Sequence, residues 1–191
     1  MKVLSLFDGI SCGMVALERA GILVERYVAY EIEPSAIKIS KKNYPQIEQC
    51  GDVFKADFSQ YSDFDILIGG SPCTFWSVAQ KADRRETTSE GLGWELFKQY
   101  IRARNESGCK YFLYENNFSM SDAIKDEITK HLGVAPIMIN SALLSAQTRK
   151  RYYWTNIPNV SVPDDKGILL QDIIESGTVD REKSLCLTRR Y

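Results

Sequence analysis

The sequence has few of the residues that metal sites and disulfide frameworks need. It contains one histidine, His131, and five cysteines that are widely spaced and never arranged as C-x-x-C. We therefore expect no zinc or other metal site and no disulfide framework, and the odd number of cysteines favours a reducing compartment. A lone histidine after a helical stretch is typical of a surface or structural residue, so histidine-based catalysis is nearly excluded.

Long apolar runs and a strong net charge are also missing. No run approaches the ~20 apolar residues that span a bilayer, and the N-terminus leads into a strand pattern without the cleavage site of a signal peptide. We therefore expect a cytoplasmic protein without membrane association. The formal net charge is −1, which does not indicate nucleic-acid binding, because affinity for DNA usually comes from lysine and arginine.

The composition and length fit one soluble domain, with 44% hydrophobic and 26% charged residues among 191. Strand patterns occur at 3–7, 25–32, 47–53 (weakly), 65–70, 111–115, 135–140 and 151–155, and helix patterns at 12–20, 34–43, 94–104 and 121–132. This alternation predicts an α/β fold with a mostly parallel sheet, helices on both faces and a closing antiparallel hairpin. We assign residues 1–160 to this domain and 161–191 to a tail.

A polar segment at 75–93 is too long for an ordinary connection between elements. It is either a disordered insertion or a mobile lid over a site.

The turns after the first three expected strands carry features of a nucleotide site. Phe7, Asp8, Gly9, Ile10, Ser11, Cys12 and Gly13 follow the first strand and open the first helix, and glycine there allows a tight turn and close approach of a ligand. Glu31 ends the second strand, where it could accept both ribose hydroxyls of an adenosine. Asp52 ends the third, where it could accept from an adenine amino group. Each feature alone is common in turns; together they predict an adenosine-type cofactor, and the lack of G-x-G-x-x-G disfavours NAD.

Reactive groups follow the next strands. Cys73 ends the run Gly69-Gly70-Ser71-Pro72-Cys73 after the most apolar strand, which predicts a thiol at the sheet edge facing a cleft rather than an inert buried cysteine. Glu115 ends the following strand and should face Cys73; a desolvated carboxyl there could stay protonated and donate to a ring nitrogen. Residues 147–151 (QTRKR) begin the last hairpin. They are either a charged turn or side chains that bind a ligand.

In this order, residues 7–13, Glu31, 51–53, 69–73, 115–117 and 147–151 resemble the motifs of the cytosine-C5 DNA methyltransferases of phages and bacteria, and they are similar also to the eukaryotic de novo branch. The resemblance covers the chain to about residue 158. It implies a class I, Rossmann-like methyltransferase fold, S-adenosylmethionine as cofactor, S-adenosylhomocysteine as product, and double-stranded DNA as substrate, in a bacterium or a phage-infected cell. It further implies cofactor contacts from residues 7–13, Glu31, Ile32, Asp52, Val53, Pro72 and Leu96.

The same resemblance implies the reaction. Cys73 would add to C6 of a flipped-out cytosine, Glu115 would stabilise the adduct at N3, and Arg149 and Arg151 would hold the nucleotide while the 75–93 segment closes. Further substrate contacts would come from Ser71, Pro72, Ser77, Asn116 and Gln147.

Family members continue beyond the 147–151 motif into a target-recognition region and a final segment, which this sequence does not contain. An expressed fragment, one subunit of a split enzyme with a second polypeptide, and a naturally short form all remain open, and activity of the isolated chain is uncertain on this basis. Two other functions also remain open: a non-catalytic accessory protein of the same fold, and a tRNA cytosine-C5 methyltransferase.

Overall fold

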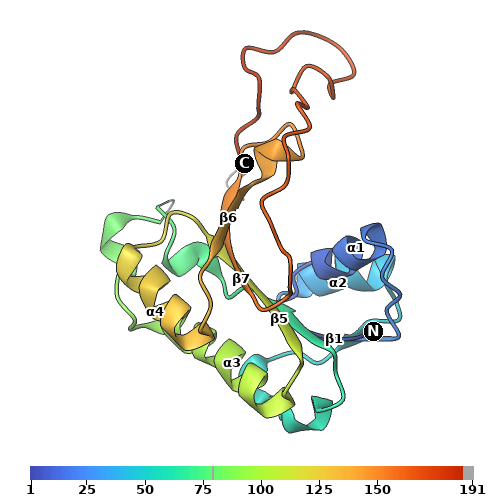
Figure 1. The fold of residues 1–191 in the computed structure, drawn as a ribbon, viewed down its shortest axis with the longest axis vertical. Coiled ribbons are helices and arrows are strands. Elements are labelled where there is room, and N and C mark those ends of the chain that lie inside the picture. The colour runs from blue at the N-terminus through green and yellow to red at the C-terminus, as the bar shows by residue number, and fades with distance from the viewer. Residues whose placement is uncertain (79, 187–191) are drawn as a thin grey trace.

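Seven strands form one mixed sheet in the order β3-β2-β1-β4-β5-β7-β6. The computed structural model describes residues 1–78 and 80–186 (Figure 1). The strands are β1 (Lys2–Leu6), β2 (Arg26–Tyr30), β3 (Glu48–Gln49), β4 (Ile66–Gly69), β5 (Tyr111–Asn117), β6 (Ile137–Asn140) and β7 (Lys150–Thr155). The pairs among β1 to β5 are parallel, and β7 runs antiparallel to both β5 and β6. The predicted fold class is therefore confirmed.

Four α-helices cover the two faces of this sheet. Helices α1 (Cys12–Arg19) and α2 (Pro34–Asn43) lie on one side, and α3 (Leu92–Ser107) and α4 (Asp122–Leu132) lie on the other (Figure 1). Pro34 occupies the first turn of α2, where its missing N–H costs nothing. Ser121 caps α4 by accepting from the backbone N–H of Ile124, as the sequence predicts.

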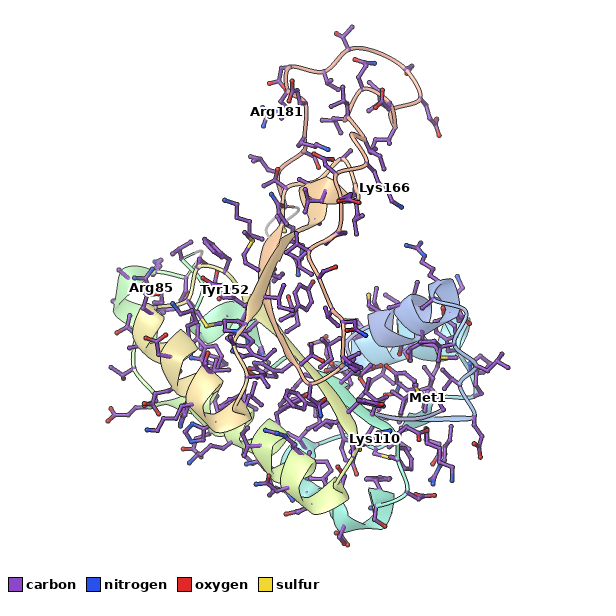
Figure 2. All side chains as sticks on the ribbon, viewed as in Figure 1. Met1, Arg85, Lys110, Tyr152, Lys166 and Arg181 are labelled. Atoms are coloured by element: carbon purple, nitrogen blue, oxygen red, sulfur yellow. The ribbon has the colours of Figure 1, made fainter. Side chains whose placement is uncertain are left out.

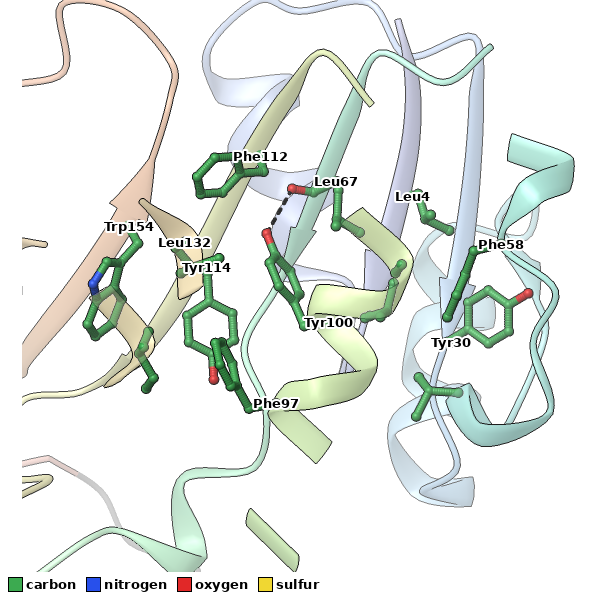
Figure 3. Close-up of a cluster of buried hydrophobic side chains, with 14 of the residues drawn as sticks. Leu4, Tyr30, Phe58, Leu67, Phe97, Tyr100, Phe112, Tyr114, Leu132 and Trp154 are labelled. Carbon is green, nitrogen blue, oxygen red and sulfur yellow. Dashed lines mark hydrogen bonds between the residues drawn. The ribbon is translucent and has the colours of Figure 1, made fainter. Parts of the chain in front are cut away.

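The core divides between the same two faces. The cluster under α3 and α4 is rich in fully buried aromatic side chains, among them Phe97, Tyr100, Phe112, Tyr114 and Trp154 (Figure 3). The cluster on the opposite face is smaller and includes Val3, Met14 and Tyr27. Burying an aromatic side chain contributes roughly 1.5–3 kcal/mol, so the α3–α4 side anchors the sheet most strongly.

The third strand is shorter than its pattern predicts. It ends at Gln49, and a 3₁₀ turn begins at Val53. Gly51 adopts a φ of 78° and the Asp52 carboxylate accepts from the Phe54 backbone N–H. An aspartate that bonds its own following backbone competes with strand pairing, and this explains the early end.

The described part of the 75–93 segment is packed onto the molecule. Trp76 is fully buried, and the Glu86 carboxylate accepts from the Trp76 indole N–H and the Gly93 backbone N–H. Ser121 donates to the Thr87 carbonyl. These contacts belong to a folded segment rather than a disordered insertion, and its action as a lid stays a prediction.

The tail lacks a core of its own, because no residue of 161–186 is buried. Its loop, which carries Lys166 and Arg181, projects away from the sheet (Figure 2). It then returns to the segment before β7, where Ser184 pairs with Gln147. Residues 187–191 of the predicted tail lie outside the described residues, and the division at residue 160 stays a prediction.

Within the described part of the chain, no helix is long and apolar enough to cross a membrane.

Candidate active site

A cavity of about 470 Å³ lies at the carboxyl ends of β1 to β4. Seven residues predicted to contact a cofactor line it: Phe7, Glu31, Ile32, Asp52, Val53, Pro72 and Leu96. Tyr30, Gly51, Phe54, Thr74, Phe75 and Leu92 complete the wall. We call this space the first cavity; its mostly apolar wall with two carboxylates has the chemistry to enclose an adenine ring and its ribose.

Glu31 ties the turn after β1 to the end of β2. Its Oε2 accepts from the Gly9 backbone N–H at 2.7 Å, and its Oε1 accepts from those of Ile32 and Glu33 at 2.8 and 2.9 Å. A carboxylate has about four acceptor sites, so capacity remains for a hydroxyl inside the cavity. Glu31 thus fixes the backbone of the two turns and remains a candidate ligand for the cofactor.

The Asp8 side chain is directed differently from the prediction. Its carboxylate accepts from the hydroxyls of Ser5, Ser11 and Tyr27, and it does not line the first cavity. Phe7 and Ser11 take left-handed φ values of 56° and 65°, which cost energy for residues with a side chain. The three hydroxyl bonds hold this strained turn in place.

The rest of that motif is divided between two places. Cys12 and Gly13 line a second cavity together with Asp8, whereas Gly9, Ile10 and Ser11 line neither cavity. Ser11 is buried and bonds the Ser40 hydroxyl. These five residues and Asp8 do not line the first cavity, and the cofactor contacts predicted for them stay predictions.

The second cavity, of about 460 Å³, adjoins the first through Phe7, which lines both. Its wall includes Gly69 at the end of β4, Gly70 after it, Glu115 of β5, Tyr153 of β7 and Arg149. The structure thus brings Glu115 and Arg149 together beside the glycine turn that leads to Cys73, and their roles stay predictions.

Glu115 and Arg151 form an ion pair in this region, with Nε and Oε1 2.6 Å apart. Burial raises the pKa of the Glu115 carboxyl above its ordinary value, against the opposing effects of Arg151 and Arg149. Glu115 also packs on Gly70, where an added Cβ would lie 2.5 Å from the Glu115 carbonyl oxygen. Only glycine allows this close approach of the turn to β5.

Cys73 begins a 3₁₀ turn, Cys73–Phe75, and is partly exposed. Its neighbours Pro72 and Thr74 line the first cavity, and Gly70 lines the second. The Asn117 side-chain amide donates to the Cys73 carbonyl at 3.4 Å, so the turn lies alongside β5, the strand of Glu115. Cys73 is therefore not buried, but it lines neither cavity, so its predicted position facing a cleft and its chemical role stay predictions.

The remaining residues predicted to contact the substrate differ in burial and in hydrogen-bond partners. Arg149 donates to the Cys186 sulfur of the tail at 3.1 Å, and the Gln147 carbonyl accepts from Ser141. Ser71 and Asn116 are buried and bond each other. The backbone N–H of Ser77 donates to the Cys73 carbonyl. Ser71 and Asn116 thus support the turn from inside.

Arg102 of α3 is a site residue that sequence reasoning missed. Its guanidinium donates to the carbonyls of Val53 and Ala56 at 2.7 and 2.9 Å and stacks on Phe58 at 4.5 Å. It thereby fixes the chain that forms one wall of the first cavity. The sequence holds no local signal for this, because the partners lie more than 45 residues away.

We expect Arg102→Met to weaken binding of S-adenosylhomocysteine about tenfold or more, since hydrogen bonds from a charged group are worth roughly 1.5–3 kcal/mol. Isothermal titration calorimetry measures this. Arg104→Met is the matched control: Arg104 lies on the same helix, donates to the Leu132 carbonyl and stacks on Phe112. Equal affinity of both variants and the unchanged protein would contradict the role of Arg102.

Among the described residues, no group of three or more His, Cys, Asp or Glu side chains could hold a metal ion.

Comparison with known proteins places the chain in a family. The model of the C-5 cytosine-specific DNA methylases matches residues 1–159. The orphan methyltransferase M.Rho11sI of Bacillus phage rho11s is 38% identical over 118 residues, 61% of this chain and 23% of the relative. The type II methyltransferase M.NgoBV of Neisseria gonorrhoeae is 28% identical over 202 residues, 93% of this chain and 47% of the relative.

A solved structure supports the fold. A protein assigned as a DNA modification methyltransferase encoded within an E. coli prophage matches with a TM-score of 0.63 and 22% identity, over 81% of this chain and 46% of its own. The fold is that of an α/β methyltransferase domain. The chain belongs to the C-5 cytosine-specific DNA methylase family. It spans less than half the length of these relatives.

Proposed function

We propose that this chain is the catalytic part of a DNA cytosine-C5 methyltransferase that acts on double-stranded DNA with S-adenosylmethionine as methyl donor. The observation that carries the proposal is that Glu115, which forms an ion pair with Arg151, lines the second cavity, and that this cavity adjoins the first. The turn of Cys73 contributes Gly70 to the wall of the second cavity, and Pro72 and Thr74 to the wall of the first. A base in the second cavity would thus lie beside a thiol, a carboxyl and the space for a methyl donor.

The first cavity fits the adenosine part of the cofactor. Phe7, Ile32 and Phe54 offer apolar surface to a ring, and Glu31 and Asp52 offer acceptors. When bound, S-adenosylmethionine supplies an electrophilic methyl group and leaves as S-adenosylhomocysteine. The chain's own contribution is to hold that group at the edge of the sheet and to exclude water from it.

Four residues of the chain would carry out the reaction at the cytosine: Cys73, Glu115, Arg149 and Arg151. The Cys73 thiolate forms a bond to C6 of cytosine, and the C5=C6 electron pair moves toward C5 and N3. The protonated Glu115 carboxyl donates to N3 and stabilises this adduct. After C5 has accepted the methyl group, the C5 proton passes to a solvent base, the C5=C6 bond re-forms, the Cys73 thiolate leaves C6, and N3 returns its proton to Glu115. Arg149 and Arg151 neutralise oxygens of the extruded nucleotide.

We expect Glu31→Ala to reduce affinity for S-adenosylhomocysteine by at least about tenfold, since a hydrogen bond to a charged group is lost. Glu33→Ala is the control, because Glu33 lies two residues away and its carboxylate accepts from Ser35. Binding is followed by calorimetry, with circular dichroism to confirm that each variant is folded. Retained affinity in the Glu31 variant would remove this residue from the cofactor site.

The proposed activity is tested by methyl transfer to nucleic acid. The full chain is incubated with labelled S-adenosylmethionine and either duplex DNA or tRNA, and the product nucleosides are identified by mass spectrometry. We expect 5-methylcytosine in the DNA. Label in tRNA alone would identify a tRNA methyltransferase, and cofactor binding without transfer to either substrate, even with the C-terminal part of a relative added, would favour the accessory role.

A further inference from the structure

A buried hydrogen-bond network lies beneath the turn that carries Cys73. The Ser71 hydroxyl and the Tyr114 phenol are 2.6 Å apart. The Asn116 side-chain amide donates to the Tyr114 phenol oxygen at 3.0 Å and to the Ser71 carbonyl at 3.1 Å. Ser71, Tyr114 and Asn116 are 3%, 0% and 1% exposed, so water does not share these bonds.

The Tyr114 ring is held by a rigid aromatic cluster. Its ring centroid lies 5.3 Å from that of Phe97, 4.8 Å from Tyr100 and 5.8 Å from Trp154 (Figure 3). A phenylalanine would keep these ring contacts. The hydroxyl is therefore the only part of the side chain that hydrogen-bonds the turn. Because the core fixes the ring, this bond also fixes the position of Ser71. Burial also raises the pKa of the Tyr114 phenol, so it stays a proton donor at neutral pH.

A second contact from the same strand reaches Cys73 itself. The Asn117 amide nitrogen donates to the Cys73 carbonyl, which also accepts from the backbone N–H groups of Trp76 and Ser77. Strand β5 thus holds the turn at Ser71 and at Cys73, on the two sides of Pro72. This strand also carries Glu115, so the same bonds fix the nucleophile relative to the carboxyl.

We infer that Tyr114 is a positioning residue that, through Ser71, fixes the turn bearing Cys73 against the strand bearing Glu115. Its catalytic consequence rests on the proposed function, whereas the ordering of the turn does not. Buried polar networks are strong when every member is satisfied and loosen together when one bond is lost. Removal of one hydroxyl should thus free the turn without removing ring packing.

Amide hydrogen exchange of Tyr114→Phe tests the ordering of the turn directly. Loss of a buried hydrogen bond should speed exchange in peptides covering residues 71–77 by about three- to tenfold. Peptides of β1 and β2 should be unchanged. Tyr100→Phe is the matched control, because Tyr100 lies in the same cluster and donates instead to the Leu67 carbonyl (Figure 3). Unchanged exchange at 71–77, or equal acceleration in both variants, would overturn the inference.

Ser71→Ala removes the partner of the Tyr114 hydroxyl. It tests the same hydrogen bond if the Tyr114 variant folds poorly. It should speed exchange at 71–77 to a similar extent, and the double variant should add little, as expected for two residues of one network. Fully additive effects would contradict a shared bond.

Methyl-transfer kinetics test the consequence for catalysis. We expect Tyr114→Phe to lower kcat about tenfold, the loss expected for one buried hydrogen bond, with KM for S-adenosylmethionine unchanged; a general loss of structure would alter both. Faster exchange with unchanged kcat would overturn the positioning role. If the unchanged protein transfers no methyl group even with the C-terminal part of a relative added, the proposed function fails, and hydrogen exchange alone decides the inference about the turn.

Discussion

Cys73→Ala should abolish methyl transfer to DNA, with a fall in rate of at least about a thousandfold, because the proposed covalent route loses its nucleophile. Affinity for S-adenosylhomocysteine should stay within about twofold, since Pro72 and Thr74, but not Cys73, line the first cavity. The rate is measured with labelled S-adenosylmethionine and duplex DNA, and the affinity by calorimetry.

Cys109→Ala serves as the control for this loss. Cys109 is also partly exposed, but it bonds Ser107 at the end of α3, away from both cavities. This variant should keep the activity of the unchanged protein. Methyl transfer by the Cys73 variant at the normal rate would rule out the covalent mechanism, whatever the control does.

Glu115→Gln should lower the rate about a hundredfold or more, the range typical of general acid–base groups. Burial raises the pKa of the Glu115 carboxyl, so its protonated form persists above the usual pH range. The rate of the unchanged protein should fall as pH rises through this raised pKa. The variant cannot titrate, so its pH–rate profile should lack that step, which kinetics across pH 4–9 would reveal.

The same shift has a consequence for stability. Between the ordinary pKa of glutamate, about 4.3, and the raised value, the folded protein binds more protons than the unfolded chain. The contribution of Glu115 to the free energy of unfolding is thus fully present below the ordinary pKa and is lost as pH rises through the raised one. Denaturant unfolding of the unchanged protein and Glu115→Gln should show their difference moving in favour of the variant with rising pH. A difference that is constant with pH would contradict the raised pKa.

The fold could be predicted because local signals agree with the topology. Pro34 at the first turn and the apolar spacing that follows define α2 with its observed bounds, and the buried run before Gly70 defines β4. Parallel strands place their carboxyl ends at one edge, so Glu31, Asp52, Pro72 and Glu115 could be assigned to one region before any coordinates were known.

The direction of individual side chains could not be predicted in this way. Asp8 stands in a loop that suggests a ligand contact, yet Tyr27 and Ser5 draw its carboxylate inward. Arg102 reaches a wall of the first cavity from a helix whose sequence gives no sign of it. Both depend on partners that only the packing of separate elements brings close, and such contacts carry no local sequence signal.

The central claim, a transient bond between the Cys73 sulfur and C6 of cytosine, is tested most directly with DNA that contains 5-fluorocytosine. Fluorine cannot leave C5 as a proton does, so the adduct persists after methylation. We predict a complex that survives denaturation, requires S-adenosylmethionine, and yields a DNA-linked peptide containing Cys73 by mass spectrometry. A stable link to another residue, or methylated product without any link, would contradict the account.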